Sequence, residues 1–231
     1  NWAWHEYGMR VGFWRIHEAL TKRGIVPTLA INGIVCETYP RVARAALDSG
    51  WEFMGHGYVQ GPMHKVEDQR AAIRQTMQAI EKFTGRKPRG WESPGLTETY
   101  ETIDILAEEG IEYVADWVLD DQPVEIATTK GPIVSVPYTV ETNDIPIMAL
   151  QHHASDAMLK RSIDHYDRLN QEGERITRVM AISVHPYLTG VPHRIRYFEQ
   201  LLDYVKAQDG TVLWTGEQIL DWYKAAKKAE K

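Results

Sequence analysis

Trp51-Glu52-Phe53-Met54-Gly55-His56-Gly57 decides the fold, because an apolar run with the pattern of a β-strand ends here on a histidine between two glycines. The apolar residues 179–184 end in the same way on His185. Glu92 and Asp116 follow two further strand-like segments. Since α/β folds place their chemistry at the ends of strands, we expect these four polar residues to face one cavity at one mouth of the fold.

Strand-like and helix-like segments alternate along the chain. Apolar spacing, with glycine and proline boundaries, predicts helices at residues 13–20, 38–50, 66–84, 99–109, 156–171, 193–208 and 217–226. Strands are predicted at residues 27–32, 51–56, 89–92, 111–116, 133–138, 178–185 and 211–214. This order is typical of a parallel sheet with helical crossovers, and seven strands suit a barrel better than an open sheet. We expect one α/β domain over residues 1–231.

The predicted order begins with a helix, whereas a barrel of strand–helix units should begin with a strand. Either residues 1–7 form a poor strand, or the strand lies before Asn1. In the second case, the position beside the strand at residues 27–32 should be vacant.

The composition is that of an ordinary globular chain, with 43% hydrophobic and 25% charged residues. A net charge of −6 disfavours nucleic acids and anionic membranes as partners. Cys36 is the single cysteine, so nothing requires an oxidising compartment, and a buried inert thiol is expected there. Because the sequence has no signal peptide or long apolar run, we expect a cytoplasmic protein; an export signal upstream of Asn1 stays open.

Six motifs follow one another in a characteristic order and spacing. They are Glu6-Tyr7-Gly8-x-Arg10-x-Gly12-x-Trp14-Arg15, Trp51-Glu52-x-x-Gly55-His56-Gly57, Thr84-Gly85-x-x-Pro88-x-Gly90-Trp91, Asp116 with Asp120-Asp121, Val136-Pro137-Tyr138-Thr139 with Thr142-Asn143-Asp144, and His185. Together they resemble the polysaccharide deacetylase (NodB-homology) family over essentially the whole chain. The closer likeness is to its cytoplasmic branch, which includes metal-independent allantoinases and related cyclic-amide hydrolases.

The resemblance implies a distorted (β/α)7 barrel that hydrolyses a carbon–nitrogen bond, either in an N-acetyl group or in a small cyclic amide. The family's first motif, an acidic pair that supplies the catalytic base and a metal ligand, is expected upstream of Asn1. The partners implied are a small amide or amino-sugar substrate and further copies of the chain. The helix that carries Trp222 and Tyr223 is the candidate subunit contact.

Two departures from the family pattern concern the metal and the substrate. Metal-binding relatives carry a second histidine four residues after the first, where this chain has Gln60. A neutral amide oxygen is a poor zinc ligand, so His56 alone is a weak metal residue and we expect no cofactor, with Zn²⁺ as the alternative. His64 is expected to be an ordinary loop residue. Leu96 stands where the allantoinases carry an arginine, which argues against allantoin itself as the substrate.

Amide hydrolysis requires an activated water, stabilisation of the oxyanion and a proton for the leaving nitrogen. We expect His185 to be the general acid and His56 to orient the water or polarise the carbonyl. Asp116 is expected to orient a catalytic histidine or to cap a turn. The predicted substrate contacts are Glu92, Trp91, Trp117, Tyr138, Asn143 and Asp144.

Each substrate contact has a structural alternative. Glu92 could be a surface charge, and Trp91 and Trp117 could pack in the core. Asn143 and Asp144 could form an Asx turn and nothing more.

The alternative function is a carbohydrate- or ligand-binding barrel that has lost the acidic first motif and its catalysis. The sequence upstream of Asn1 discriminates the two classes. A strand that ends in an acidic residue favours the enzyme, whereas a start codon just upstream favours the binding protein.

Overall fold

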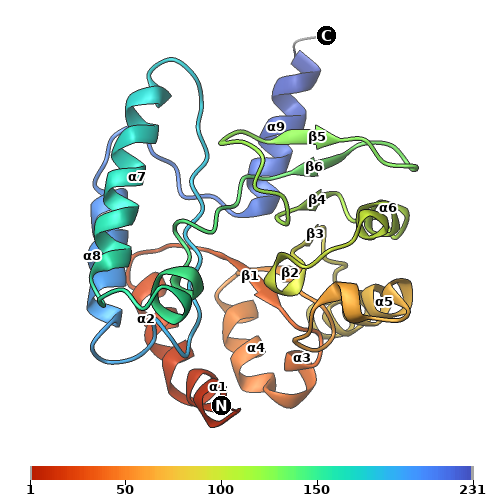
Figure 1. Cartoon of the computed structure of the whole chain (residues 1–231), viewed down its shortest axis with the longest axis horizontal. Coiled ribbons are helices and arrows are strands. Elements are labelled where there is room, and N and C mark those ends of the chain that lie inside the picture. Colours follow the sequence, from red (N-terminus) through yellow and green to blue (C-terminus); the bar gives the residue numbers. More distant parts are fainter. Residues whose placement is uncertain (1, 230–231) are drawn as a thin grey trace. The chain divides into compact units, whose positions relative to one another are not determined.

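The computed structural model of the chain describes residues 2–229, which form two compact units (Figure 1). The first unit consists of the residues up to Val26 together with Thr139–Leu213. The second unit consists of Pro27–Tyr138 together with the chain from Trp214 onward. Each unit is therefore assembled from segments that lie far apart in the sequence.

The second unit is built on one six-stranded sheet with the order β1-β2-β3-β4-β6-β5. The strands are β1 (Thr28–Ile31), β2 (Glu52–Gly55), β3 (Gly90–Trp91), β4 (Tyr113–Val114), β5 (Val124–Ile126) and β6 (Ile133–Ser135). Neighbours from β1 to β6 pair in parallel, and β5 runs antiparallel to β6. Because the four parallel pairs share one direction, the carboxyl ends of β1 to β4 and β6 lie along one edge of the sheet.

The helices of this unit begin and end at residues whose chemistry explains the boundaries. They are α3 (Val35–Thr38), α4 (Pro40–Asp48), α5 (Gln69–Thr84), α6 (Tyr100–Glu108) and α9 (Gly216–Ala229), with short 3-10 turns η2 (Met63–Lys65) and η3 (Pro94–Leu96). The Asp68 carboxylate accepts the Ala71 N–H at 2.9 Å and caps α5, which ends at Gly85 with φ 80°. Thr99 and Thr102 form a capping box at the start of α6.

The first unit is mainly helical. It contains α1 (Trp2–Tyr7), the π-helix η1 (Gly8–Gly12), α2 (Phe13–Thr21), η4 (Ile145–Leu150), α7 (Ala157–Gly173) and α8 (Ile195–Lys206). A bidentate pair joins Arg23, just after α2, to Asp203 of α8, with Nε–Oδ1 and Nη2–Oδ2 distances of 2.6 and 2.7 Å. Tyr166 of α7 packs with Leu201 and Val205 of α8 in the apolar core of this unit.

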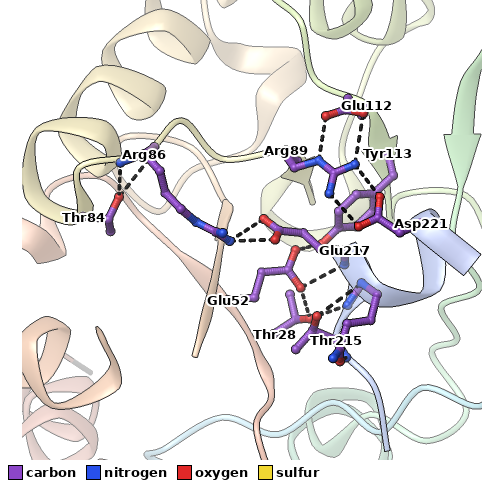
Figure 2. A network of polar contacts seen from close by, with 12 residues as sticks. Thr28, Glu52, Thr84, Arg86, Arg89, Glu112, Tyr113, Thr215, Glu217 and Asp221 are labelled. Atoms are coloured by element: carbon purple, nitrogen blue, oxygen red, sulfur yellow. Dashed lines mark hydrogen bonds and ion pairs between the residues drawn. The ribbon is translucent and has the colours of Figure 1, made fainter. Parts of the chain in front are cut away.

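A polar network joins α9 to the amino-terminal ends of the strands (Figure 2). Glu52, at the start of β2, is 3% exposed. Its Oε2 accepts hydrogen bonds from the Thr28 hydroxyl at 2.7 Å and from the Glu217 N–H at 3.1 Å, and its Oε1 accepts one from the Tyr113 hydroxyl at 2.5 Å. The carboxylate therefore lies at the N-terminus of α9, where the helix dipole favours negative charge.

Ion pairs on the surface continue this network (Figure 2). Arg89 contacts Glu112 at 2.6 Å and Asp221 of α9 at 2.7 Å, and Arg86 contacts Glu217 at 2.6 Å. The Arg89 guanidinium is the main cause that lowers the pKa of Glu112 to about 2. These contacts hold α9 against β3 and β4, so this end of the sheet has a structural role.

The structure corrects two strand predictions. Residues 178–185 form no strand; they make only an isolated parallel bridge between Ser183 and Asn143. Residues 211–214 form no strand either: Val212, Leu213 and Trp214 are exposed, and the segment pairs with none of the described strands. Both segments have the apolar residues typical of a strand, but a short apolar run forms a strand only where a partner strand is available.

The start of the chain is helical from Trp2, so residues 2–7 do not form the poor strand that was one alternative; Asn1 lies outside the described residues. Within residues 2–229, β1 is an edge strand that pairs only with β2. The antiparallel strand β5 was not predicted. None of the helices described in this range is long and apolar enough to cross a membrane.

Candidate active site

Three of the predicted polar residues follow neighbouring strands of the second unit. His56 follows β2 directly, Glu92 follows β3 directly, and Asp116 comes two residues after β4. The strand register pairs Gly55 with Trp91, so His56 and Glu92 leave the sheet at the same level. The sequence prediction that these side chains emerge at one sheet edge is therefore consistent with the backbone.

His56 is oriented by the backbone of Glu92. Its Nδ1 lies 2.8 Å from the Glu92 carbonyl oxygen. Because a carbonyl oxygen only accepts hydrogen bonds, Nδ1 carries the proton in this contact, and Nε2 of the neutral ring carries the lone pair. His56 thus presents a basic nitrogen.

Asp116 contacts Ser93 and no histidine in this unit. It is 4% exposed, and its carboxylate accepts hydrogen bonds from the Ser93 N–H and, at 3.0 Å, from the Ser93 hydroxyl. Ser93 directly follows Glu92, whose carbonyl orients His56. Asp116 is therefore connected to His56 only through the backbone of residues 92–93 in these contacts, which is closer to the capping alternative than to the direct contact with a histidine.

The carboxyl groups of Glu92, Glu98 and Asp116 have an unusual environment. Burial raises the pKa of Glu92 to about 8, with a further contribution from the charge of Asp116, while a hydrogen bond with Tyr138 lowers it. Burial also raises the pKa of Asp116 to about 7 and that of Glu98 above its usual range. At neutral pH, the Glu92 carboxyl group therefore retains its proton.

We expect folded-state stability to fall as pH rises through about 8, because Glu92 keeps its proton in the folded chain but ionises near pH 4.5 in the unfolded chain. Its contribution is fully present below about pH 4.5 and is lost above pH 8. Gln cannot ionise, so the Glu92→Gln melting temperature should exceed that of the unaltered protein by more at pH 8.5 than at pH 5.5. Thermal melts across this range measure the difference.

Asp116 is unchanged in Glu92→Gln, so its raised pKa still makes the stability of that variant depend on pH. The matched control is Glu101→Gln on the exposed side of α6, which should follow the unaltered protein at every pH. Parallel curves for Glu92→Gln and Glu101→Gln would contradict the raised pKa of Glu92.

His185 belongs to the first unit and is paired with Asp144. The ring Nδ1 lies 2.6 Å from Asp144 Oδ1, and the His185 N–H donates to Oδ2 at 2.7 Å. Asp144 is fully buried, whereas the His185 side chain is 35% exposed. A histidine held on one nitrogen by a buried carboxylate and accessible on the other is the arrangement that general acid–base catalysis requires.

The amino-terminal helices pack against the turn that carries His185. The Tyr187 ring lies 4.4 Å from His5, 5.1 Å from Trp4 and 6.0 Å from His185, measured between ring centroids. Gly12 approaches Pro186 so closely that a Cβ added there would lie 2.0 Å from the Pro186 carbonyl oxygen. The motif at residues 6–15 therefore packs against and supports the segment that carries His185.

The remaining predicted residues have several placements. Trp91 is fully buried in the apolar core, which leaves it no surface for a substrate, while Trp117 and Tyr138 are partly exposed. Asn143 Oδ1 accepts the Ile145 N–H at 2.8 Å, which is the Asx contact named as the alternative. The Asp144 side chain is fully buried against His185, so it offers no exposed surface to a substrate.

Cys36 is buried, and burial raises the pKa of its thiol to about 11, as expected for an inert side chain. No motif in the sequence indicates a role for Ser93 or Thr189. The only sequence signals for these residues are their positions, one residue after Glu92 and four after His185.

The donor set was compared with the needs of a catalytic zinc ion, which takes three protein ligands. Since Nδ1 of His56 contacts a carbonyl oxygen, Nε2 is the one ring atom that could bind a metal, whereas Gln60 and His64 lie at exposed positions after β2. Among residues 2–229, no group of three or more His, Cys, Asp or Glu side chains is placed to hold a metal ion. These residues do not fit a three-ligand zinc site.

Comparison with known proteins gives consistent matches. The polysaccharide deacetylase family matches residues 5–114. A Schizosaccharomyces pombe protein assigned to the polysaccharide deacetylases is 28% identical over 95% of this chain and 75% of its own length.

Solved structures are also similar. The PuuE allantoinase has a TM-score of 0.91 at 26% identity, covering 96% of this chain and 75% of its own. A Pseudomonas aeruginosa PAO1 protein described as a polysaccharide deacetylase has a TM-score of 0.89 at 26% identity, covering 96% and 76%. This likeness confirms the α/β fold class predicted from the sequence.

Proposed function

Because the chain belongs to the polysaccharide deacetylase family, we propose that His56 and His185 are catalytic residues of a hydrolase. The chain is a hydrolase of carbon–nitrogen bonds other than peptide bonds, either by deacetylation or by amide hydrolysis. The single observation that carries the catalytic assignment is the His185–Asp144 pair, with its 2.6 Å contact and its accessible ring.

In the proposed mechanism, water adds to the amide carbonyl carbon while Nε2 of His56 accepts the proton that the water loses. His185 then donates a proton to the nitrogen of the tetrahedral intermediate, and the carbon–nitrogen bond breaks. Asp144 stabilises the charged form of His185 before that transfer. Asp116 is a positioning residue, because it holds Ser93 and thereby the carbonyl that orients His56.

Glu92 supports a small amide as the substrate class. A protonated carboxyl group offers one O–H donor and one carbonyl acceptor, which match the C=O and N–H of an amide or imide edge. Its pKa of about 8 keeps that proton at neutral pH. Tyr138 and Trp117, both partly exposed, are the proposed apolar wall beside it, and Asn143 is assigned to the support of the Asp144 segment.

A substrate panel tests this proposal. Succinimide, hydantoin and allantoin are assayed for ring opening, and N-acetylglucosamine oligomers are assayed for acetate release. We expect ring opening of succinimide or hydantoin, abolished in His185→Ala. Acetate release without ring opening would overturn the small-amide assignment, and binding of the oligomers without any turnover would favour the carbohydrate-binding alternative.

Metal independence is the second part of the proposal. Since one imidazole cannot hold Zn²⁺ tightly, we expect the purified protein to contain zinc well below one ion per chain and to keep its activity in chelator. Elemental analysis before and after dialysis against EDTA measures both. The variant Gln60→His, which restores the missing family histidine, should take up more zinc. One zinc per chain in the unaltered protein, lost together with activity, would show that other residues complete a site.

A homo-oligomer is the proposed assembly, supported by an exposed aromatic pair. Trp222 of α9 is 37% exposed, and its ring centroid lies 6.5 Å from that of Trp214, which is 41% exposed. Exposed tryptophans are enriched at subunit contacts. Light scattering should give a mass above 26.5 kDa that Trp222→Glu lowers, with Tyr100→Glu as the exposed aromatic control. A monomeric mass at micromolar concentration would contradict the assembly.

A further inference from the structure

The turn that follows His185 returns to the same carboxylate that holds the His185 ring. The Leu188 and Thr189 N–H groups both donate to the His185 carbonyl oxygen, at 3.0 and 2.9 Å. This single helical turn places Thr189 above its starting residue. The Thr189 hydroxyl then donates to Asp144 Oδ2 at 2.6 Å.

Asp144 therefore accepts three short hydrogen bonds. Oδ1 takes the His185 ring, while Oδ2 takes the His185 N–H and the Thr189 hydroxyl. Asp144 is fully buried and Thr189 is 2% exposed, so water cannot readily replace a lost donor. Without the Thr189 hydroxyl, Oδ2 would keep only the His185 N–H as a donor, so the hydroxyl is the one contact on Asp144 in this set that does not come from His185 itself.

We propose that Thr189 is a positioning residue for catalysis, which fixes the Asp144 carboxylate and thereby holds the His185 ring in the tautomer with hydrogen on Nδ1. This inference rests on the proposed function of His185 as the general acid. Two other charged or titratable groups face this cluster. Burial and the charge of Asp144 raise the pKa of the Tyr187 phenol, and Arg194 lines a small cavity with Thr189. Neither replaces the Thr189 hydroxyl as a donor to Oδ2 in the contacts described for Asp144.

The test compares Thr189→Val with Thr189→Ser. Valine keeps the shape but removes the hydroxyl, and serine keeps the hydroxyl. Nitrogen-15 NMR of labelled histidine reports the His185 tautomer without any substrate. In spectra taken at a pH high enough for the His185 ring to be neutral, we expect the Nδ1–H tautomer in the unaltered protein and in Thr189→Ser, and a mixture of the two neutral tautomers in Thr189→Val.

Kinetics on the most rapidly opened cyclic imide of the panel supply the second readout. Thr189→Val should lower kcat about tenfold with KM nearly unchanged, as expected for loss of one hydrogen bond to a charged group, and Thr189→Ser should recover most of it. The matched control is Thr211→Val, which removes a hydroxyl that contacts Tyr166 at 2.5 Å. It should change neither readout.

The two readouts separate this inference from the function beneath it. An unchanged His185 tautomer in a folded Thr189→Val protein would overturn the positioning role. A shifted tautomer in a protein that hydrolyses no member of the panel would uphold the role of Thr189 and overturn the proposed reaction.

Discussion

Asp144→Asn is expected to lower kcat by about 10³- to 10⁴-fold, because the amide can neither hold the Nδ1–H of His185 as a carboxylate does nor stabilise the charged ring. The structure gives this substitution an unusually strong effect, since Asp144 accepts both the ring and the backbone N–H of His185. Steady-state kinetics across pH are the measurement, and KM should change little.

Asp164→Asn is the matched control, because it makes the same chemical change on an exposed position of α7 in the same unit. Thermal melts of both variants separate a catalytic defect from unfolding. An Asp144→Asn protein that stays folded and keeps more than a tenth of its activity would remove His185 from the role of general acid.

Gly12→Ala is expected to destabilise the protein by about 2–4 kcal/mol, because the new methyl group would overlap backbone atoms that cannot turn away. The added Cβ would lie 2.0 Å from the Pro186 carbonyl oxygen and 2.8 Å from its carbon. For a chain of this size, that loss corresponds to a fall in Tm of roughly 5–15 °C. Activity should fall as well, since Pro186 directly follows His185.

Gly173→Ala tests the same change where space is available. Gly173 closes α7, and a Cβ there meets no atom within 4 Å. Alanine should be neutral or slightly stabilising at this helical position. Equal melting temperatures for the two variants would show that the backbone at Gly12 and Pro186 can move apart without loss of folding stability.

The placement of His56 directly after a strand could be predicted because its signal is local. An apolar run that ends on Gly55-His56-Gly57 specifies a strand and its end within seven residues, and β2 ends at Gly55. The same reasoning placed Glu92 and Asp116 after β3 and β4. Helices with clear glycine or threonine boundaries, such as α5 and α6, were also found within a few residues.

Partner identity could not be predicted, because it depends on residues distant in sequence. His185 is held by Asp144, 41 residues earlier, and nothing in the local pattern of Asp144 distinguishes a buried partner from a residue at a pocket rim. For Asp116 the sequence left two roles open, orientation of a histidine or capping of a turn, and its carboxylate accepts the backbone N–H and the hydroxyl of Ser93. Strand predictions failed at residues 178–185 and 211–214 for the related reason that pairing needs a neighbour that a one-dimensional pattern does not reveal.

The assembly of each unit from distant segments has a consequence for how the chain is made. In the first unit, Arg15 donates to the Gly190 carbonyl across 175 residues, and in the second, Gly216 donates to Thr28 across 188. At the usual rate of protein synthesis, about 5–20 residues per second, 175 residues take roughly 9–35 s. Throughout that interval, the first helices on the ribosome lack the surfaces against which they will pack. Neither unit can therefore close until Gly190 and Gly216, respectively, have been synthesised, and until then the helices and strands made first expose the faces that they later bury.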